Sequence, residues 1–212
     1  MDLTFDTISA EEYDEHRRRF DPLTDALRAL IDVGIHTDVD DSTVLLALEH
    51  LEEAHALLEQ KVRTTRSTLR HADTGRAVVW GNPAIGLRNA IAPPMEVHRE
   101  PDGSCWSEFT LGPMYEGPPG RVHGGICALL LDHLLGEVAS EGLNLPKFTG
   151  TISLRYVRGT PLGPLRAEGF VERSEGAKTF ARGYLKDADG ATVEAEGVFI
   201  MPAWARDAGR SA

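Results

Sequence analysis

Residues 117–136 read GPPGRVHGGICALLLDHLLG, and this stretch decides the fold. Prolines and glycines break the chain before His123, whereas an apolar run follows the His-Gly-Gly turn. Wound as an α-helix, that run places apolar side chains nearly all the way round and leaves no broad polar face. We therefore predict one long helix, from His123 to Gly142, that is buried on most of its sides.

Segments with strand character flank this helix on both sides. Before it, residues 95–100 and 104–111 lie on either side of Pro101-Asp102-Gly103, which predicts a hairpin. After it, three or four further strands follow between short turns: FTGTISLRYV, LRAEGFVERS, AKTFARGYLKD and ATVEAEGVFIM. Short connections join antiparallel neighbours, so we predict an α+β domain with one helix laid against one sheet.

The chain before this domain has helical character up to about residue 70. Ser9 and Glu12 form a capping-box pattern at the start of a first helix. Asp21-Pro22 supplies an N-cap and a first-turn proline for a second helix, which we expect Gly34 to end.

A third helix begins near Ser42 and carries an apolar stripe from Val44 to Leu58 at three- and four-residue spacing, with its glutamates turned elsewhere. An apolar stripe of this kind needs another apolar surface to pack against. We divide the chain into a helical extension, a main domain and a tail, at residues 1–75, 76–205 and 206–212.

The composition limits the classes of partner. Lys and Arg total 22 against 33 Asp and Glu, a formal net charge of −11, which argues against nucleic acid and anionic membranes because like charges repel. No apolar run approaches the ~20 residues of a membrane span, and the N-terminus lacks the apolar core of a signal peptide. Cys105 and Cys127 belong to no disulfide framework, so we expect a soluble, cytoplasmic protein.

Asp132 is the residue of the predicted helix that most needs an explanation. Gly125, Ala128 and Leu129 share its face, so the carboxylate is poorly solvated. Leaving it ionised and unpaired costs several kcal/mol. It is therefore either a functional group or a structural one, hydrogen-bonded to a backbone group or a hydroxyl.

The His123-Gly124-Gly125 turn places unpaired amides and the positive end of the helix dipole where an anion or a developing oxyanion can bind. The alternative is an ordinary tight turn that His123 caps. Gly125 and Asp132 are seven residues apart, about 10.5 Å along the axis, too far to touch one reacting carbon. Two copies side by side would bring them together, and a homodimer would also cover the helix.

Residues 117–136, followed by TGTISLRYVRGTPLG at 149–163, closely resemble the PaaI-like and THEM4-like thioesterases of the hotdog superfamily, over about residues 78–201. The signature is His-Gly-Gly with an acidic residue nine positions after the His, then a strand ending in Tyr-x-x-(Pro or Gly)-x-Pro-Leu-Gly. The resemblance implies a hotdog fold, an antiparallel sheet wrapped around one long central helix, here with an N-terminal helical extension. It also implies an acyl-CoA thioesterase, acting as a homodimer or homotetramer with sites at the subunit interface.

Carried onto this chain, the resemblance implies that Asp132 orients or deprotonates the attacking water, or attacks the thioester itself. The Gly124 amide would polarise the thioester carbonyl, and His123 would support the turn. Thr149 falls where relatives carry a hydroxyl that positions the nucleophile. Thr151, two residues away on the same side of a regular strand, stays an alternative.

One position departs from the pattern of some PaaI-like relatives, which carry an Asn six residues before the histidine, where this chain has Gly117.

Hydrolysis by this route needs no metal or other cofactor, because CoA is part of the substrate, and the scattered histidines predict no metal site. Candidates to bind the CoA moiety are Gly125, Arg121, Arg155, Arg158, Lys178, Arg182 and Lys186, although most charged strand residues only face solvent. Trp80, Trp106, Phe109 and Phe199 either line an acyl pocket or pack in the core.

Two other functions remain open. A non-catalytic acyl-CoA-binding or regulatory hotdog module would use the same pocket to sense a ligand. A hotdog hydratase or dehydratase fits less well, because the adjacent Asp132 and His133 point about 100° apart on a helix.

Overall fold

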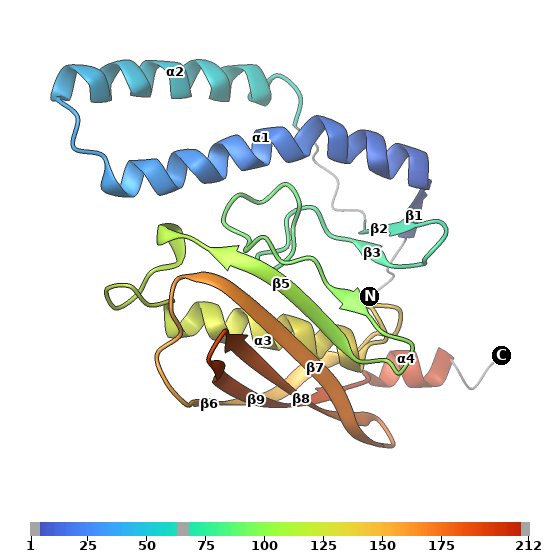
Figure 1. Ribbon diagram of the computed structural model, residues 1–212. Helices are drawn as coiled ribbons and strands as arrows, with labels where there is room; N and C mark the ends of the chain where they lie inside the picture. Colours follow the sequence, from blue (N-terminus) through green and yellow to red (C-terminus); the bar gives the residue numbers. More distant parts are fainter. Residues whose placement is uncertain (1–4, 63–67, 209–212) are drawn as a thin grey trace.

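The computed structural model in Figure 1 describes residues 5–62 and 68–208. An antiparallel sheet curves around one long helix, and two further long helices lie outside it. The elements in chain order are β1 (Phe5–Ile8), α1 (Ala10–His36), α2 (Asp41–Glu59), β2 (Thr68–His71), β3 (Ala77–Val78), β4 (His98–Arg99), β5 (Cys105–Leu111), η1 (Pro113–Tyr115), α3 (Gly124–Ala139), β6 (Phe148–Tyr156), β7 (Gly163–Glu175), β8 (Lys178–Asp187), β9 (Gly190–Ile200) and α4 (Ala203–Ala208).

The main sheet has the strand order β4-β5-β7-β8-β9-β6, and all neighbouring pairs are antiparallel. The predicted hairpin is present as β4 and β5, although β4 has only two residues. Two-residue turns join β7 to β8 and β8 to β9. The predicted α+β domain is therefore confirmed, and β6 lies at an edge of its sheet.

The predicted central helix is α3, and it packs into the hollow of the sheet. Leu130, Leu131, Leu134 and Leu135 are all fully buried. Gly183 on β8 allows the close approach, because a Cβ atom there would lie 2.9 Å from the Leu135 side chain. The helix ends at Ala139, three residues earlier than predicted.

An irregular segment of the same chain, residues 79–97, covers another side of α3. Ile85, Met95 and Val97 from this segment pack against the core that α3 forms with the sheet. Residues 95–97, predicted as the start of a strand, belong to this irregular segment, and glycine, proline and asparagine hide the buried apolar positions before them. With this segment, a single chain buries more of the surface of α3 than the sequence predicts.

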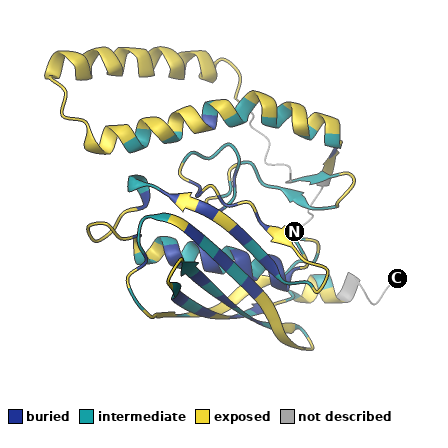
Figure 2. Ribbon diagram, viewed as in Figure 1, coloured by how far each residue is buried: buried dark blue, intermediate teal, exposed yellow. Residues whose placement is uncertain are grey.

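One stripe of α3 still has no cover from its own chain. Gly125 is exposed, and Ala128, Leu129 and Asp132 are only partly buried. Figure 2 shows such partly buried positions interrupting the buried surface of the helix. The carboxylate of Asp132 is therefore on the open side of α3.

The extension differs from its prediction. α1 is a single helix of 27 residues that runs through Pro22, so the break predicted at Asp21-Pro22 is wrong. Pro22 is exposed, and the carbonyl group that loses its helical partner can bind water instead. The capping box of Ser9 and Glu12 is confirmed.

A small sheet, β1-β2-β3, was not predicted, and in it β1 and β2 run parallel. This small sheet contains residues from both sides of the predicted boundary between residues 75 and 76. At the other end, residues 206–208 of the predicted tail belong to α4, and 209–212 lie outside the described residues. Within residues 5–62 and 68–208, no helix combines the length and apolar character needed to cross a membrane.

Arg76, in the turn between β2 and β3, is paired with α3. Its guanidinium group donates to the Glu137 carboxylate at 2.5 Å, and His133 Nε2 lies 3.2 Å from the same oxygen. Glu137 is 1% exposed, and a carboxylate so deeply buried needs such partners.

Candidate active site

Asp132 on α3 has one hydrogen-bond partner from the sheet. The Thr149 hydroxyl on β6 donates to Asp132 Oδ1 at 2.9 Å. A hydroxyl that donates to one carboxylate oxygen fixes the carboxylate's direction and leaves the other oxygen available. Asp132 and Thr149, two predicted site residues seventeen positions apart, are thus in direct contact.

A β-bulge decides between Thr149 and Thr151. The register against β9 shifts at this point, so that Thr149 pairs with Phe199 and Thr151 pairs with Val198. Phe199 is fully buried in the core, whereas Val198, its neighbour in the strand, faces the other way. The expectation that the two threonines share a side is therefore wrong, because Gly150 is an extra residue in the strand.

The turn before α3 is capped by His123. Its Nδ1 accepts from the Gly125 amide at 3.0 Å, so this amide is already occupied. Within the described part of the chain, no group accepts from the Gly124 amide, which is one of the free donors at the start of α3. The geometry thus separates the two glycines, and Gly124 is the one with a free donor.

Tyr156 at the end of β6 holds the same turn. Its hydroxyl donates to the Gly124 carbonyl oxygen at 2.9 Å. Partial burial raises the pKa of Tyr156, so the hydroxyl stays protonated and able to donate. No role for Tyr156 follows from the sequence, where it is only part of a motif, because its contact with the turn is a tertiary one.

Gly117 has a structural reason to be glycine. A Cβ atom at this position would lie 2.8 Å from the Cα atom of His123, closer than real side chains come. The chain therefore has no room here for the Asn side chain that some PaaI-like relatives carry.

The Gly124 amide and the Asp132 carboxylate do not meet within one chain. They are eight residues apart on α3, which is about 12 Å along the helix axis. A reaction that uses both groups on one carbon needs them from two chains.

Most of the cations predicted to bind CoA are paired with carboxylates of their own chain. Arg155 pairs with Glu194, Arg158 pairs with Asp187, and Arg182 pairs with Glu172 and Glu196. Lys186 pairs with Glu168. Arg121 and Lys178 are exposed and have no ion pair among the described residues, and their part in binding CoA stays a prediction.

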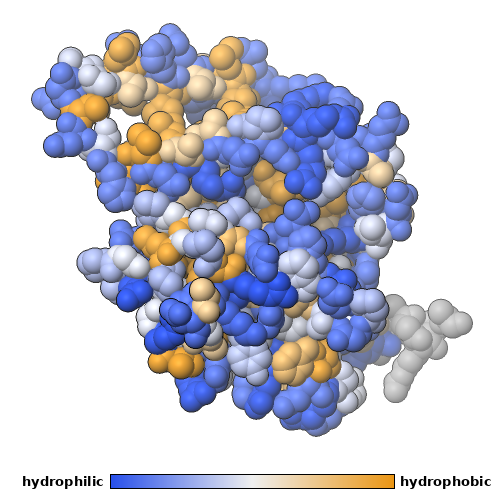
Figure 3. All heavy atoms as spheres, viewed as in Figure 1, coloured by the Kyte–Doolittle hydropathy of each residue, from blue (hydrophilic) through white to orange (hydrophobic). Residues whose placement is uncertain are grey.

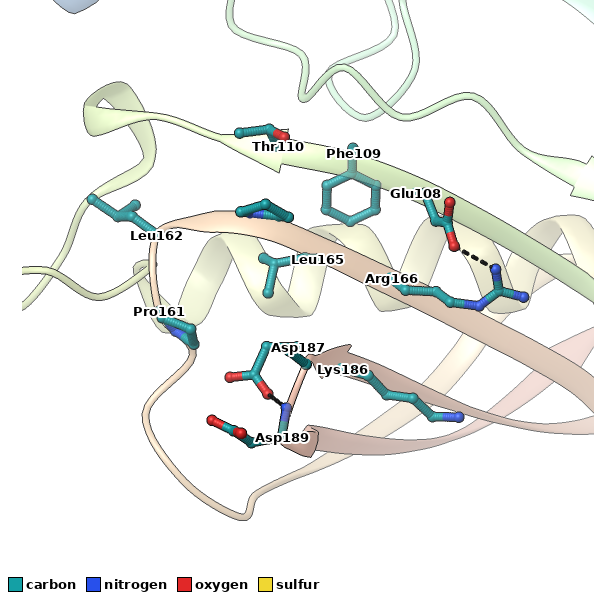
Figure 4. A pocket seen from close by; sticks show the side chains of 12 residues that line it. Glu108, Phe109, Thr110, Pro161, Leu162, Leu165, Arg166, Lys186, Asp187 and Asp189 are labelled. Atoms are coloured by element: carbon teal, nitrogen blue, oxygen red, sulfur yellow. Dashed lines mark hydrogen bonds and ion pairs between the residues drawn. The ribbon is translucent and has the colours of Figure 1, made fainter.

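A cavity of about 720 Å³ is shown in Figure 4. It opens between β5, β7 and the β8–β9 turn, and Arg166 in its wall is paired with Glu108. It contains neither Asp132 nor Thr149. Of the aromatic candidates for an acyl pocket, Phe109 lines this cavity, Phe199 is fully buried, and Trp80 lines a second cavity under α1.

Parts of this chain are similar in sequence to known proteins. The chain is 34% identical over 94 residues to the acyl-coenzyme A thioesterase THEM4 of Xenopus laevis, a match covering 44% of this chain and 42% of that protein. It is 33% identical over 99 residues to the acyl-coenzyme A thioesterase THEM5 of Mus musculus, covering 44% and 38%. The matches thus span about two fifths of these curated relatives. No family model matches the sequence.

A solved structure covers nearly the whole chain. It is a crystal structure of a protein named as a thioesterase superfamily protein, with 35% sequence identity and a TM-score of 0.76. The match covers 85% of this chain and 90% of that one. The chain belongs to the thioesterase superfamily. As a member of this superfamily, the protein has the hotdog fold that its sequence resemblance implied.

Proposed function

We propose that this member of the thioesterase superfamily hydrolyses acyl-CoA to a free acid and CoA, with Asp132 as the catalytic carboxylate. The observation that carries the proposal is the hydrogen bond from Thr149 to Asp132 on the open stripe of α3. A structural aspartate could also bind a hydroxyl, but it would have no need of the free carboxylate oxygen that Asp132 keeps on a face that ligands can reach. The curated relatives named as acyl-coenzyme A thioesterases support the same substrate class.

In the proposed reaction, Asp132 activates a water molecule held against its free oxygen. The water oxygen attacks the thioester carbon, its proton passes to the carboxylate, and the carbonyl oxygen becomes an oxyanion. The Gly124 amide donates to that oxyanion. Collapse of the intermediate breaks the carbon–sulfur bond, and the thiolate of CoA takes up the proton. Direct attack by the carboxylate on the carbon is the alternative first step.

The complete site would need two copies of the chain. The open stripe of α3 and the free edge of β6 adjoin each other through the Thr149–Asp132 contact. A long unpaired edge strand with exposed apolar side chains, here Phe148 and Tyr156, favours pairing with another chain. A two-fold pairing there would place the Gly124 amide of one copy opposite Asp132 of the other and create two equal sites.

The test is release of free thiol from a panel of acyl-CoAs that differ in chain length and aromaticity. We expect Asp132→Asn to lower kcat by about 10²–10⁴-fold, the usual contribution of a positioned acid–base group. Circular dichroism and unfolding curves check that the variant keeps its fold. Full activity of Asp132→Asn would exclude the assigned role.

The same panel of acyl-CoAs distinguishes the enzyme from the alternative, a non-catalytic acyl-CoA-binding module. Binding of acyl-CoA without any thiol release from the unmodified protein would favour a sensing module over an enzyme. Release that stops in Asp132→Asn would support the enzyme and rank its substrates.

A further inference from the structure

The first turn of α3 has one amide available for an oxyanion. The Gly125 amide donates to His123 Nδ1. The next two amides, of Ile126 and Cys127, both donate to the His123 carbonyl oxygen. Among the residues that the structure describes, no acceptor takes the Gly124 amide. Sites that stabilise an oxyanion surround it with several fixed donors, so the proposed site needs a further donor from outside this turn.

The side chains just before the turn do not supply this donor. Gly117 has no side chain, and a Cβ atom there would lie 2.8 Å from the Cα atom of His123. The His123 ring uses Nδ1 to cap the turn, and its Cδ2 edge lies over Gly117, 3.1 Å from where a Cβ atom would be. We therefore looked for the donor on the elements that pack against the turn.

Tyr156, the last residue of β6, is the side chain nearest to Gly124. Leaving aside the adjacent residues and the helix backbone, the atom closest to a Cβ atom on Gly124 would be the Tyr156 hydroxyl oxygen, at 3.3 Å. Any Cβ atom lies about 2.5 Å from its own amide nitrogen, so the hydroxyl oxygen and the Gly124 nitrogen are at most about 6 Å apart. One oxygen can accept hydrogen bonds from two donors up to about 6 Å apart. The two donors are therefore close enough to share one oxyanion.

The Tyr156 hydroxyl is free to leave its present acceptor. It donates to the Gly124 carbonyl oxygen at 2.9 Å. Gly124 is the first residue of α3, so the same carbonyl also accepts from the amide of Ala128, four residues further along the helix. A carbonyl oxygen has two lone pairs, and one remains satisfied when the hydroxyl turns to a substrate. The turn of the hydroxyl leaves no unsatisfied backbone group behind.

A substrate can reach the Tyr156 ring, which is 54% exposed. In Figure 1, β6 lies below α3, whereas α1 and α2 lie above it. Figure 3 shows the apolar side chains of α1 and α2 gathered at that upper end of the chain. The helical extension of the same chain therefore does not cover Tyr156.

We propose that Tyr156 is a catalytic residue, which donates the second hydrogen bond to the thioester oxygen beside the Gly124 amide. This inference rests on the proposed function, and it gives Tyr156 the task of the Asn side chain for which Gly117 leaves no room. As water attacks the thioester carbon, the carbonyl oxygen gains negative charge and the hydroxyl turns towards it. The phenol keeps its proton throughout, and the hydroxyl returns to the Gly124 carbonyl when the thiolate leaves.

The first test is the steady-state rate of thiol release by Tyr156→Phe, which removes the hydroxyl and keeps the ring. Loss of one oxyanion donor lowers kcat by about 10²–10³-fold, and KM changes little because the bond is strongest in the transition state. The matched control is Tyr184→Phe, the same change on the outer face of β8, which should leave kcat within about twofold. A kcat for Tyr156→Phe equal to that of the control would overturn the proposal.

Infrared spectroscopy separates donation to the substrate from support of the turn. The probe is an acyl-CoA with a ¹³C-labelled thioester carbonyl, bound to Asp132→Asn so that it persists. Hydrogen bonds to a carbonyl lower its stretching frequency, so adding Tyr156→Phe should raise the frequency. The Gly125 amide should exchange its hydrogen at an unchanged rate, because His123 still caps it. An unchanged frequency, or a change that comes with faster exchange of this amide, would mean that Tyr156 only holds the turn.

Thiol release by the unmodified protein separates this proposal from the proposed function. If no acyl-CoA of the panel released thiol, both proposals would be wrong. Release that stops in Asp132→Asn but continues unchanged in Tyr156→Phe would overturn only the role of Tyr156.

Discussion

The Thr149 hydroxyl donates a hydrogen bond of 2.9 Å to the Asp132 carboxylate and thereby joins β6 to the open stripe of α3. β6 is an edge strand, so the residue that orients the carboxylate lies where the proposed second copy would pair. The geometry of the proposed site and the proposed pairing of two chains therefore depend on the same strand.

Removing the Thr149 hydroxyl should weaken catalysis without abolishing it. Thr149→Ala loses one hydrogen bond to a charged group, worth about 1.5–3 kcal/mol, so we expect kcat to fall by about 10- to 100-fold. Thr151→Ala is the matched control, because Thr151 faces away from Asp132 and its loss should leave kcat within about twofold. Equal effects of the two substitutions in thiol-release assays would remove Thr149 from the site.

Two inactive variants should restore activity when mixed. Gly124→Pro removes the free amide at a helix position where proline is tolerated, and the extended backbone of His123 is compatible with a following proline. Random exchange of its subunits with Asp132→Asn subunits gives mixed dimers with one intact site, about a quarter of the sites of the unmodified protein.

The readout for the mixture is thiol release after the two variants are unfolded together and refolded. Each variant refolded alone is the control. Activity that stays at the level of the separate variants would show that Gly124 and Asp132 do not serve a common site from two chains.

Arg76→Ala should destabilise the fold strongly. Glu137 would keep a buried carboxylate with only His133 beside it, and breaking such a buried ion pair typically costs about 3–5 kcal/mol. Arg155→Ala removes an exposed partner of Glu194 and should cost less than about 1 kcal/mol. Urea unfolding monitored by tryptophan fluorescence gives both values, and equal losses would mean that the Arg76–Glu137 pair contributes no more than a surface pair.

The Arg158–Asp187 pair should make stability depend on pH in the acid range. Hydrogen bonding from Arg158 lowers the pKa of Asp187 from 3.8 to about 2 in the folded chain. A lowered pKa contributes stability that is complete above the unfolded value, so we expect its loss as the pH falls from about 4 to about 2.

Urea midpoints between pH 2 and pH 6 test this dependence. Asp187→Asn should be less stable than the unmodified chain at pH 6, and the difference should shrink towards pH 2. Asp189→Asn, at the exposed turn residue two positions further on, is the control and should not change the slope. If the difference in stability between Asp187→Asn and the unmodified chain did not change with pH, the charge of Asp187 would contribute nothing to stability.

The sequence predicted the parts of the molecule that local patterns encode. The apolar period of α3 placed Asp132 correctly beside Gly125, Ala128 and Leu129, because helix geometry relates these positions without further information. The capping box of α1 was likewise readable from two residues. The break at Pro22 was wrong, since an exposed proline can be carried within a long helix.

Contacts that depend on tertiary structure were beyond the sequence. Nothing local relates Arg76 to Glu137, or Tyr156 to the Gly124 carbonyl, so both contacts were missed. The choice between Thr149 and Thr151 was open because a bulge leaves no clear mark in the pattern. One signal was present: Thr149 lies at an odd spacing from Ile152 and Leu154, which face the core, and a regular strand cannot place them all on one side.

The bulge at Gly150 gives this strand an unusual response to insertion and deletion. Thr149 and Thr151 already pair with consecutive residues of β9, so excising Gly150 would leave every later residue of β6 facing its present side. A Cβ atom at position 150 would lie 2.7 Å from Ile200 Cδ1, which is the end of an exposed side chain that can rotate away. At this one position, the strand should therefore accept the loss of a whole residue about as readily as a small change of side chain.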